Sequence, residues 1–383
     1  MRKTDEMKTM DRERIVIRGL NWLGDAIMCL PALHTLREAH PTAHIAILTP
    51  IKLTDLWRSP LIDEVIGFES EESLRSVVRK LRAGRFATGI VLPMSFRSAL
   101  EFRLAGIPTR IGTEHKGRQV LLSHPIRKPS GILEMKKRTV NEILRANEAA
   151  DRKRPISPSH QSHHVNRYLH LVAALGADPT PRAPFLPIAD GEAAAIQAHF
   201  FPGRSTGAPL LMGMCPGAEY GNTKRWPEER FVEAACRLHQ QTGCEWLLFG
   251  TQGERAACER IVSAIHAQIG RATAFNMAGQ TSLWELAVLL RGCAVVIGND
   301  SGPMHLAAAV GAPVSVLFAS TSAELTGPGL PGAGGHSLIV SESPCSPCFL
   351  RACPLDMRCM NSLTTDRMVQ GVLDLLRETP ATS

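Results

Sequence analysis

One stretch limits the possible folds of this chain more than any other. Residues 294–310 read AVVIGNDSGPMHLAAAV. A short apolar run typical of a buried parallel strand leads through a glycine turn at 298–302 into a helix-forming run that starts at Pro303. A strand that turns into a helix in this way directs free backbone N–H groups and the positive end of the helix dipole at one point, which suits a phosphate.

Three polar side chains accompany this turn. Asp300, Ser301 and His305 would line its mouth, at the edge where open α/β sheets bind ligands. The alternative is an ordinary connection in which Ser301 only caps the helix.

The length and charge of the chain narrow its class. With 383 residues, 44% of them hydrophobic, it can form two domains with substantial cores. The net charge of +7 predicts an anionic partner, which could be nucleic acid, a phosphorylated glycolipid or an anionic membrane face. Only 5% of the residues are aromatic, and no basic–aromatic cluster occurs, so no nucleic-acid partner is expected.

The N-terminus and hydropathy favour a cytoplasmic location. Residues 1–14 are charged and lack an apolar core, so we expect a disordered tail and not a secretory signal. No apolar run reaches about 18 residues, so no membrane-spanning helix is expected. The basic charge could still hold the chain against the inner face of the inner membrane.

The N-terminal half opens with a β-α-β pattern. Strands at 15–17 and 43–48 flank a helix at 26–39, which predicts a parallel sheet. Asp25 precedes this helix at the carboxyl end of the first strand, where it could accept a proton; alternatively, it only caps the helix.

Several weaker signals follow along this half. Further strands are expected at 64–68 and 88–92, and the second leads into a loop with Arg97, either an anion contact or a surface arginine. Residues 130–154 have a charged helical pattern, and another helix is expected from 163 to 175. His160, His163 and His164 lie near each other, but their irregular surroundings argue against a metal site. The four prolines in the segment that ends at 187 predict a linker at 177–187.

The C-terminal half repeats the same plan. A strand at 209–214 is followed by a glycine-containing loop at 215–227, where Lys224 beside a helix start could hold a diphosphate. After the next strand, Glu254 could hold a sugar hydroxyl or, alternatively, help a helix to begin. Two such domains, at 15–180 and 188–383, would bind ligands in a cleft between them.

Four motifs in the chain carry a family resemblance. They are WLGD at 22–25, LPMSFRSA at 92–99, CPGAEY with KRWP within 215–227, and NDSGPMH at 299–305. Together and in this order they resemble the bacterial ADP-heptose:lipopolysaccharide heptosyltransferases of glycosyltransferase family 9, most of all the heptosyltransferase II type. The resemblance implies a GT-B fold, with two Rossmann-like doubly wound domains facing across a cleft.

The resemblance also implies a reaction. Heptose would move from ADP-heptose to the lipopolysaccharide inner core with inversion, the first domain holding the acceptor and the second the nucleotide sugar. Asp25 matches the family's catalytic base, and Arg97 matches a basic position on the acceptor side. The positions that match the donor site are Lys224, Glu254, Asp300, Ser301, Gly302 and His305. This scheme requires no metal or other cofactor, because cationic groups and helix N–H donors can stabilise the departing ADP.

A cysteine cluster near the C-terminus allows a separate interpretation. Cys345, Cys348, Cys353 and Cys359 form a C-x2-C-x4-C-x5-C pattern, which could hold structural zinc or an iron–sulfur cluster. The alternative is a set of unligated thiols. Either way, we expect the cluster to tie the last helix, at 365–377, to the body of the protein.

Two other functions remain open from the sequence. One is a GT-B glycosyltransferase that uses another nucleotide sugar. The other is a non-catalytic module that binds nucleotide or nucleic acid through the positive charge.

Overall fold

The computed structural model describes residues 13–129, 132–133, 135–148, 160–204 and 207–378. Most of the expected tail therefore lies outside the described residues, and Arg14, the last residue of that predicted tail, instead opens the first strand. The chain divides into two compact units. The first takes the described residues of Met1–Asn21, Ala32–Lys128 and Tyr168–Thr180; the second takes those of Trp22–Pro31, Pro129–Arg167 and Pro181–Ser383.

The first unit is built on a six-stranded parallel sheet with the order β3-β2-β1-β4-β5-β6. Its strands are β1 (Arg14–Arg18), β2 (His44–Pro50), β3 (Glu64–Phe68), β4 (Thr88–Val91), β5 (Thr109–Thr113) and β6 (His124–Ile126). In the register, Ile15 lies beside Ile45 on one side and Thr88 on the other. Its helices and 3-10 turns are α2 (Leu30–Ala39), η1 (Ile51–Trp57), α3 (Leu74–Ala83), α4 (Phe96–Ala105), η2 (Arg118–Leu121) and η4 (Ala173–Leu175), with α6 (His164–Val172) shared with the second unit.

The second unit is built on another six-stranded parallel sheet, with the order β12-β11-β10-β7-β8-β9. Its strands are β7 (Leu211–Cys215), β8 (Glu245–Leu248), β9 (Ala274–Asn276), β10 (Val295–Asn299), β11 (Val314–Phe318) and β12 (His336–Val340). When the strands are ranked along the chain, both sheets have the same doubly wound order, which reverses between the first and fourth strands. Ligands bind at such a reversal, next to the carboxyl ends of the strands.

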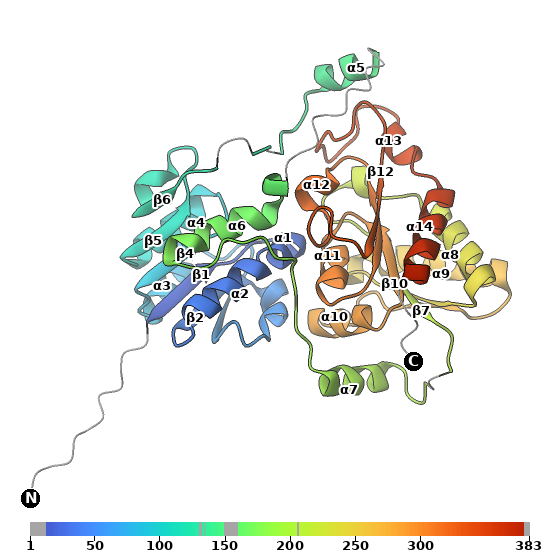
Figure 1. Ribbon diagram of the computed structural model, residues 1–383, viewed down its shortest axis with the longest axis horizontal. Coiled ribbons are helices and arrows are strands. Elements are labelled where there is room, and N and C mark those ends of the chain that lie inside the picture. The colour runs from blue at the N-terminus through green and yellow to red at the C-terminus, as the bar shows by residue number, and fades with distance from the viewer. Residues whose placement is uncertain (1–12, 130–131, 134, 149–159, 205–206, 379–383) are drawn as a thin grey trace, which may run out of the picture. The chain divides into compact units, whose positions relative to one another are not determined.

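Helices cover both faces of the second sheet. Figure 1 shows α14 with α8 and α9 on one side, and α10 with α11 on the other. The helices and 3-10 turns of this unit are α1 (Leu23–Met28), α5 (Val140–Glu148), η3 (His160–Ser162), α7 (Asp190–Phe200), η5 (Asn222–Lys224), α8 (Glu228–Thr242), η6 (Gln252–Glu254), α9 (Arg255–Ile269), α10 (Leu283–Arg291), α11 (Gly302–Ala309), α12 (Ala323–Thr326), α13 (Arg358–Asn361) and α14 (Thr365–Glu378).

Two predicted helices differ from the observed ones. The helix expected at 26–39 is two helices, α1 and α2, that meet at Cys29. Pro31 explains the break, because proline has no N–H and fits only in the first turn of a helix. The helix expected at 130–154 is confirmed only as α5, since described residues 135–139 are irregular and 149–154 lie outside the description.

Residues 177–189 contain neither helix nor strand, and the division between the two units falls within them, after Thr180. No helix in the described part of the chain is both long and apolar enough to cross a bilayer.

Candidate functional site

A buried ion pair lies at the point where the second sheet reverses direction. Asp300 follows β10, and Lys224 ends η5 in the loop after β7; the Lys224 Nζ donates to Asp300 Oδ2 over 2.6 Å and to the Asp300 carbonyl over 3.1 Å. The Thr321 hydroxyl donates to the same Oδ2 over 2.6 Å. Burial is the largest influence on Asp300 and opposes its ionisation, but the charge and hydrogen bond of Lys224, the nearby His305 and the hydrogen bond from Thr321 together hold the carboxyl pKa below its ordinary value. The pair is therefore a fixed cation and anion at a ligand-binding edge.

The first turn of α11 begins beside this pair. Ser301 takes the N-cap position, and Pro303 lies in the first turn, but the Ser301 side chain makes no capping hydrogen bond. Its hydroxyl is buried and has no hydrogen-bond partner among the residues that the structure describes. The backbone N–H groups of this turn could thus bind an anionic ligand, and the enclosed Ser301 hydroxyl has an unused hydrogen bond beside them.

The loop after β7 is held in place by buried hydrogen bonds. The Asn299 side chain donates to the Pro216 carbonyl over 2.7 Å and accepts from the Trp226 N–H over 3.1 Å. The Tyr220 hydroxyl donates to the Phe349 carbonyl over 2.9 Å, and the Lys224 Nζ lies 5.1 Å from the centre of the Tyr220 ring. The position of Lys224 is therefore fixed by its surroundings.

Close packing between α1 and α11 brings Asp25 into the same unit as the ion pair. A Cβ on Gly24 would lie 2.7 Å from His305 Cδ2, and a Cβ on Gly302 would lie 2.7 Å from Leu23 Cβ. Glycine at both positions is what allows the two helices to approach this closely. The first turns of the two helices consequently lie side by side.

Asp25 sits inside the first turn of α1, three residues after the N-cap Trp22, and α1 has no side-chain cap. The Asp25 side chain is 32% exposed, and its Oδ1 lies 3.9 Å from His164 Nδ1 at the start of α6. The expected helix start at 26 was therefore too late, and the geometry gives Asp25 a solvent-accessible carboxylate without a capping bond.

Three buried histidines, His163, His164 and His305, lie in this region. Burial lowers the pKa of His305 and of His163 to about 4, and burial also lowers that of His164. His163 has a partner, because its Nε2 lies 3.1 Å from the Gly327 carbonyl. For His164, neither ring nitrogen has a hydrogen-bond partner within the described part of the chain.

Glu254 helps a helical turn to begin, which is the alternative role that the sequence allowed. Its carboxylate accepts from the Thr251 N–H over 2.8 Å and from the Thr251 hydroxyl over 3.0 Å, as a capping box at the start of η6. A Cβ on Gly217 would lie 1.9 Å from Glu254 Oε1, so this carboxylate also lies directly against the loop after β7. The donor role of Glu254 stays a prediction.

Arg97, the predicted acceptor contact, belongs to the first unit. It lies in α4, where its Nε donates to Glu101 over 3.2 Å and its Nη2 donates to the Glu72 carbonyl over 2.5 Å. Its side chain is half exposed. Its role toward an acceptor stays a prediction.

All ten cysteines lie in the described part of the chain, and all are free thiols. A hydrogen bond with Cys359 lowers the pKa of Cys345 to about 6. Across the described residues, no group of three or more His, Cys, Asp or Glu side chains is arranged to hold a metal ion. The structure therefore does not support the zinc or iron–sulfur site predicted at Cys345, Cys348, Cys353 and Cys359.

The cysteine-rich segment instead packs into the core of the second unit. Cys345, Cys348 and Cys359 lie in one cluster with residues of α14, including Val369 and Val372. The segment also braces the loop after β7, because the Phe349 and Leu350 carbonyls accept from Tyr220 and Thr223.

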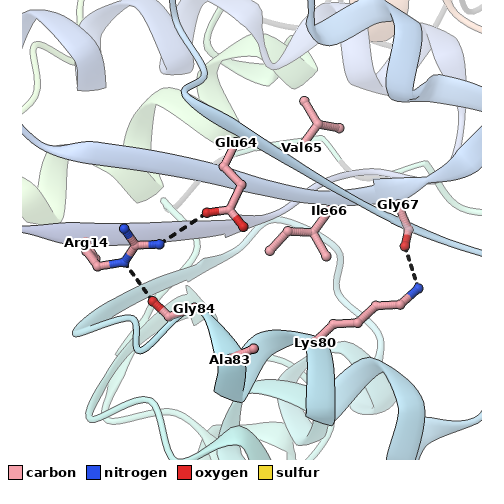
Figure 2. Close-up of a pocket in the computed structure, with 8 residues that line it drawn as sticks. All are labelled: Arg14, Glu64, Val65, Ile66, Gly67, Lys80, Ala83 and Gly84. Carbon is pink, nitrogen blue, oxygen red and sulfur yellow. Dashed lines mark hydrogen bonds and ion pairs between the residues drawn. The ribbon is translucent and has the colours of Figure 1, made fainter.

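A pocket of about 490 Å³ lies elsewhere, in the first unit (Figure 2). Residues at the start of β1, in β3 and at the end of α3 line this pocket. Its polar groups are already paired: Arg14 with Glu64 at 3.1 Å, and Lys80 with the Gly67 carbonyl at 2.7 Å. Ligands of parallel sheets bind at the opposite, carboxyl ends of the strands, so we do not assign a function to this pocket.

Sequence reasoning missed two residues of the site. Thr321 follows β11, the neighbour of β10, so the rule that parallel strands end at one edge could have found it. His164 was considered only as a metal ligand, and no local pattern signals its burial beside Asp25.

Comparison with known proteins agrees with this architecture. Residues 133–358 match glycosyltransferase family 9 (heptosyltransferase). The chain is 30% identical to lipopolysaccharide heptosyltransferase 2 of Escherichia coli K12, over 82% of this chain and 85% of that protein, and 29% identical to lipooligosaccharide heptosyltransferase 2 of Haemophilus influenzae, again over 82% and 85%.

Solved structures give the same result. The structure of E. coli ADP-heptose lps heptosyltransferase II is similar with a TM-score of 0.73 and 27% identity, covering 96% of this chain and 99% of that one. A family 9 glycosyl transferase from Veillonella parvula shares the fold with a TM-score of 0.73 at 21% identity, over 96% and 98%. The predicted GT-B fold and the predicted family are confirmed: this chain belongs to glycosyltransferase family 9, the heptosyltransferases, and is an enzyme of lipopolysaccharide biosynthesis.

Proposed function

We propose that this enzyme transfers L-glycero-D-manno-heptose from ADP-heptose to the inner core of lipopolysaccharide, with inversion at the anomeric carbon. The observation that carries the proposal is the grouping, in one unit, of the Lys224–Asp300 pair, the first turn of α11 and the Asp25 carboxylate. The names of the relatives, which are heptosyltransferases of lipopolysaccharide or lipooligosaccharide, support the choice of sugar and acceptor.

The donor is assigned to the edge of the second sheet. Lys224 and the N–H groups at the start of α11 would bind the diphosphate, and the unpartnered Ser301 hydroxyl would donate a further hydrogen bond. Asp300 would hold Lys224 in position, and Gly302 would leave room for the close approach of α1. Glu254 would contact heptose hydroxyls from the edge of the loop after β7.

The chemistry requires one base and a stabilised leaving group. Asp25 would take the proton from the attacking acceptor hydroxyl, whose oxygen bonds to the anomeric carbon as the bond from that carbon to the diphosphate breaks. ADP would leave with the electron pair of that bond, stabilised by Lys224 and the α11 N–H groups. No metal or other cofactor takes part in this scheme.

The remaining roles follow from the same proposal. Residues 15–180 would form the acceptor domain, with Arg97 as an acceptor contact, and residues 188–383 would form the donor domain. The enzyme would work in the cytoplasm, at the inner face of the inner membrane, where its net positive charge favours contact with anionic lipid.

The test is the Asp25→Asn variant, assayed with ADP-heptose and a truncated inner-core acceptor. We expect turnover to fall by about 10²-fold or more while ADP-heptose binding is retained, because the amide cannot accept the proton. Asp366→Asn, which changes an exposed carboxylate on α14, is the matched control and should leave turnover unchanged. Near-normal turnover in Asp25→Asn would remove Asp25 from this role.

A further inference from the structure

A run of exposed apolar side chains marks one part of the second unit. We call residues 132–133 and 135–148 the α5 arm. Leu133, Met135, Val140 and Leu144 are each at least 40% exposed. Val140 and Leu144 are four residues apart on α5 and therefore lie on the same side of that helix. Of the fifteen large apolar side chains that are exposed in the described part of the chain, four thus lie within twelve residues of the sequence.

The α5 arm is held to its own unit by other groups. Ile143 is buried in the core cluster that contains Cys345 and Cys348. The Arg138 N–H donates to the Cys348 carbonyl over 3.1 Å, and the Arg138 side chain donates to the Pro344 carbonyl over 2.9 Å. In Figure 1, α5 lies next to α13. The side chain of Arg358, the first residue of α13, donates to Asn147 of the arm over 3.3 Å. The exposed apolar residues are thus not the ones that anchor the arm.

The described residues of the α5 arm carry a net positive charge. Its four basic residues, Lys136, Lys137, Arg138 and Arg145, outnumber Glu142 and Glu148, which gives +2. Lys136 has an 85% exposed side chain whose Nζ lies 4.0 Å from Glu142 Oε1, and Lys137 and Arg145 are exposed as well. Apolar side chains interspersed with basic ones are the composition that binds at the surface of an anionic bilayer.

We propose that the α5 arm docks the enzyme on an anionic phospholipid membrane. Val140, Leu144, Leu133 and Met135 would enter the boundary between headgroups and acyl chains, while Lys136, Lys137 and Arg145 pair with lipid phosphates. This inference rests on the proposed function in one respect: a lipopolysaccharide acceptor is carried by a lipid, so the enzyme must work beside a bilayer.

The test is flotation of the full chain with vesicles of phosphatidylethanolamine and phosphatidylglycerol. We expect binding to these vesicles, weakening with added salt, and little binding to vesicles of phosphatidylcholine alone. The Lys136→Ser/Lys137→Ser variant should bind about thirtyfold more weakly. The Val140→Ser/Leu144→Ser variant should lose at least tenfold.

A matched control changes exposed apolar residues elsewhere in the same unit. Leu338→Ser/Val340→Ser, on β12, should float like the unmodified chain. Equal binding by the control and the arm variants would overturn the proposal, as would binding that is indifferent to phosphatidylglycerol. Heptose transfer to a delipidated core oligosaccharide distinguishes the membrane proposal from the proposed function. The arm variants should retain this transfer. Absence of transfer by the unmodified chain would count against the proposed function alone.

A second, independent observation concerns His164. Its side chain is 3% exposed, both ring nitrogens lack a hydrogen-bond partner among the described residues, and Nδ1 lies 3.9 Å from Asp25 Oδ1. A buried polar group without a partner is costly, so it is typically retained for a reason. The charged or titratable groups that influence it are Asp25, Asp300, Arg167, His163 and His305.

We infer that His164 is a positioning residue for Asp25. The Nδ1–H would donate to one carboxylate oxygen and turn the other toward the acceptor hydroxyl. The distance of 3.9 Å is longer than a hydrogen bond, and catalytic hydrogen bonds often shorten only when substrate is bound. This inference also rests on the proposed role of Asp25.

The test compares His164→Ala with His164→Asn, whose side-chain amide retains a donor. We expect kcat to fall about tenfold or more in His164→Ala with the KM for ADP-heptose unchanged, and to recover partly in His164→Asn. His163→Asn is the control, because His163 already bonds to Gly327; it should lower stability and leave kcat within about twofold. Unchanged kcat in His164→Ala, or an equal loss in His163→Asn, would overturn the inference. Normal turnover in the Asp25→Asn variant would instead refute the proposed role of Asp25 as the base.

Discussion

The two units carry buried ion pairs at equivalent places in their sheets. The pairs differ in how exposed their side chains are and in whether an unpaired hydrogen-bond donor lies beside them. In the first unit, Arg18 ends β1 and its Nε donates to Glu101 of α4 over 3.0 Å; in the second, Lys224 follows β7 and pairs with Asp300 after β10. Each pair spans the first and fourth strands of a doubly wound sheet. The same fold therefore places opposite charges at the same reversal point twice.

The Arg18 pair is enclosed by protein. Arg18 also donates to the Gly19 carbonyl and lies 4.3 Å from the centre of the Phe68 ring, and Glu101 accepts a second bond from Arg97. The exposed fractions of the two side chains are 7% and 2%. With its donors and acceptors paired inside the unit, this pair has a structural role.

The Lys224 pair is less enclosed. Its lysine side chain is 15% exposed, and the unpartnered Ser301 hydroxyl and the start of α11 lie in the same turn as Asp300. The two pairs therefore differ in the unpaired donor beside them, and we propose that this difference makes only the Lys224 pair a binding site. Four predictions test this difference, in order of expected effect.

The largest effect is expected from Arg18→Met. It leaves the Glu101 carboxylate buried with one partner fewer, which should lower the free energy of unfolding by about 3 kcal/mol. ADP-heptose affinity should not change. Urea unfolding and calorimetric donor titration measure the two quantities; a tenfold loss of donor affinity without loss of stability would reverse the assigned roles.

Lys224→Ala differs from Arg18→Met in that it should change donor affinity as well as stability, because it also leaves the buried Asp300 without its cation. Removal of the cation from the proposed diphosphate site should weaken ADP-heptose binding by about 10²-fold, as expected for a charge-assisted contact. Calorimetric titration with ADP-heptose measures this directly, and Lys80→Ala in the first unit is a matched control that should bind normally. Unchanged affinity in Lys224→Ala would exclude the lysine from the donor site.

The stability of the second unit should depend on pH through its buried histidines. The native pKa of His305 is about 4, below the ordinary 6.5, so the unfolded state takes up more protons between these values. The stabilisation is complete above about pH 6.5 and is lost as the pH falls toward 4. His305 should therefore contribute a loss of about 2 kcal/mol between pH 7 and pH 5.

Urea unfolding of the unmodified chain and of His305→Gln at the two pH values measures this contribution. The variant should show a smaller difference between pH 7 and pH 5, by about 2 kcal/mol. An identical pH dependence in both proteins would mean that His305 is not held uncharged by burial.

The smallest effect is expected from Thr321→Val, which removes the hydroxyl that donates to Asp300. One such bond contributes about 1 kcal/mol. ADP-heptose affinity should therefore fall about fivefold, because Asp300 and Lys224 would be held less firmly in position. Thr326→Val, whose hydroxyl donates to the backbone carbonyl of Ser322 at the N-cap of α12, is the control. Equal donor affinity in both variants would show that Thr321 does not support the pair.

Local sequence patterns predicted the strand and the helix that form the site. An apolar run and the proline at 303 determine a strand, a turn and a helix within a few residues. It could not predict contacts between distant segments. The bonds from Thr321 to Asp300 and the burial of His164 depend on which strands become neighbours and on how α6 packs. The irregular residues before α5 were missed for a similar reason, since Arg138 bonds to a segment two hundred residues away.

The most direct measurement is heptose transfer by the unmodified chain from ADP-heptose to a defined inner-core acceptor, with the product identified by mass and anomeric configuration. We expect one heptose to be added with inverted configuration, and none from UDP-sugars. Transfer from a UDP-sugar, or retention of configuration, would contradict the proposed reaction.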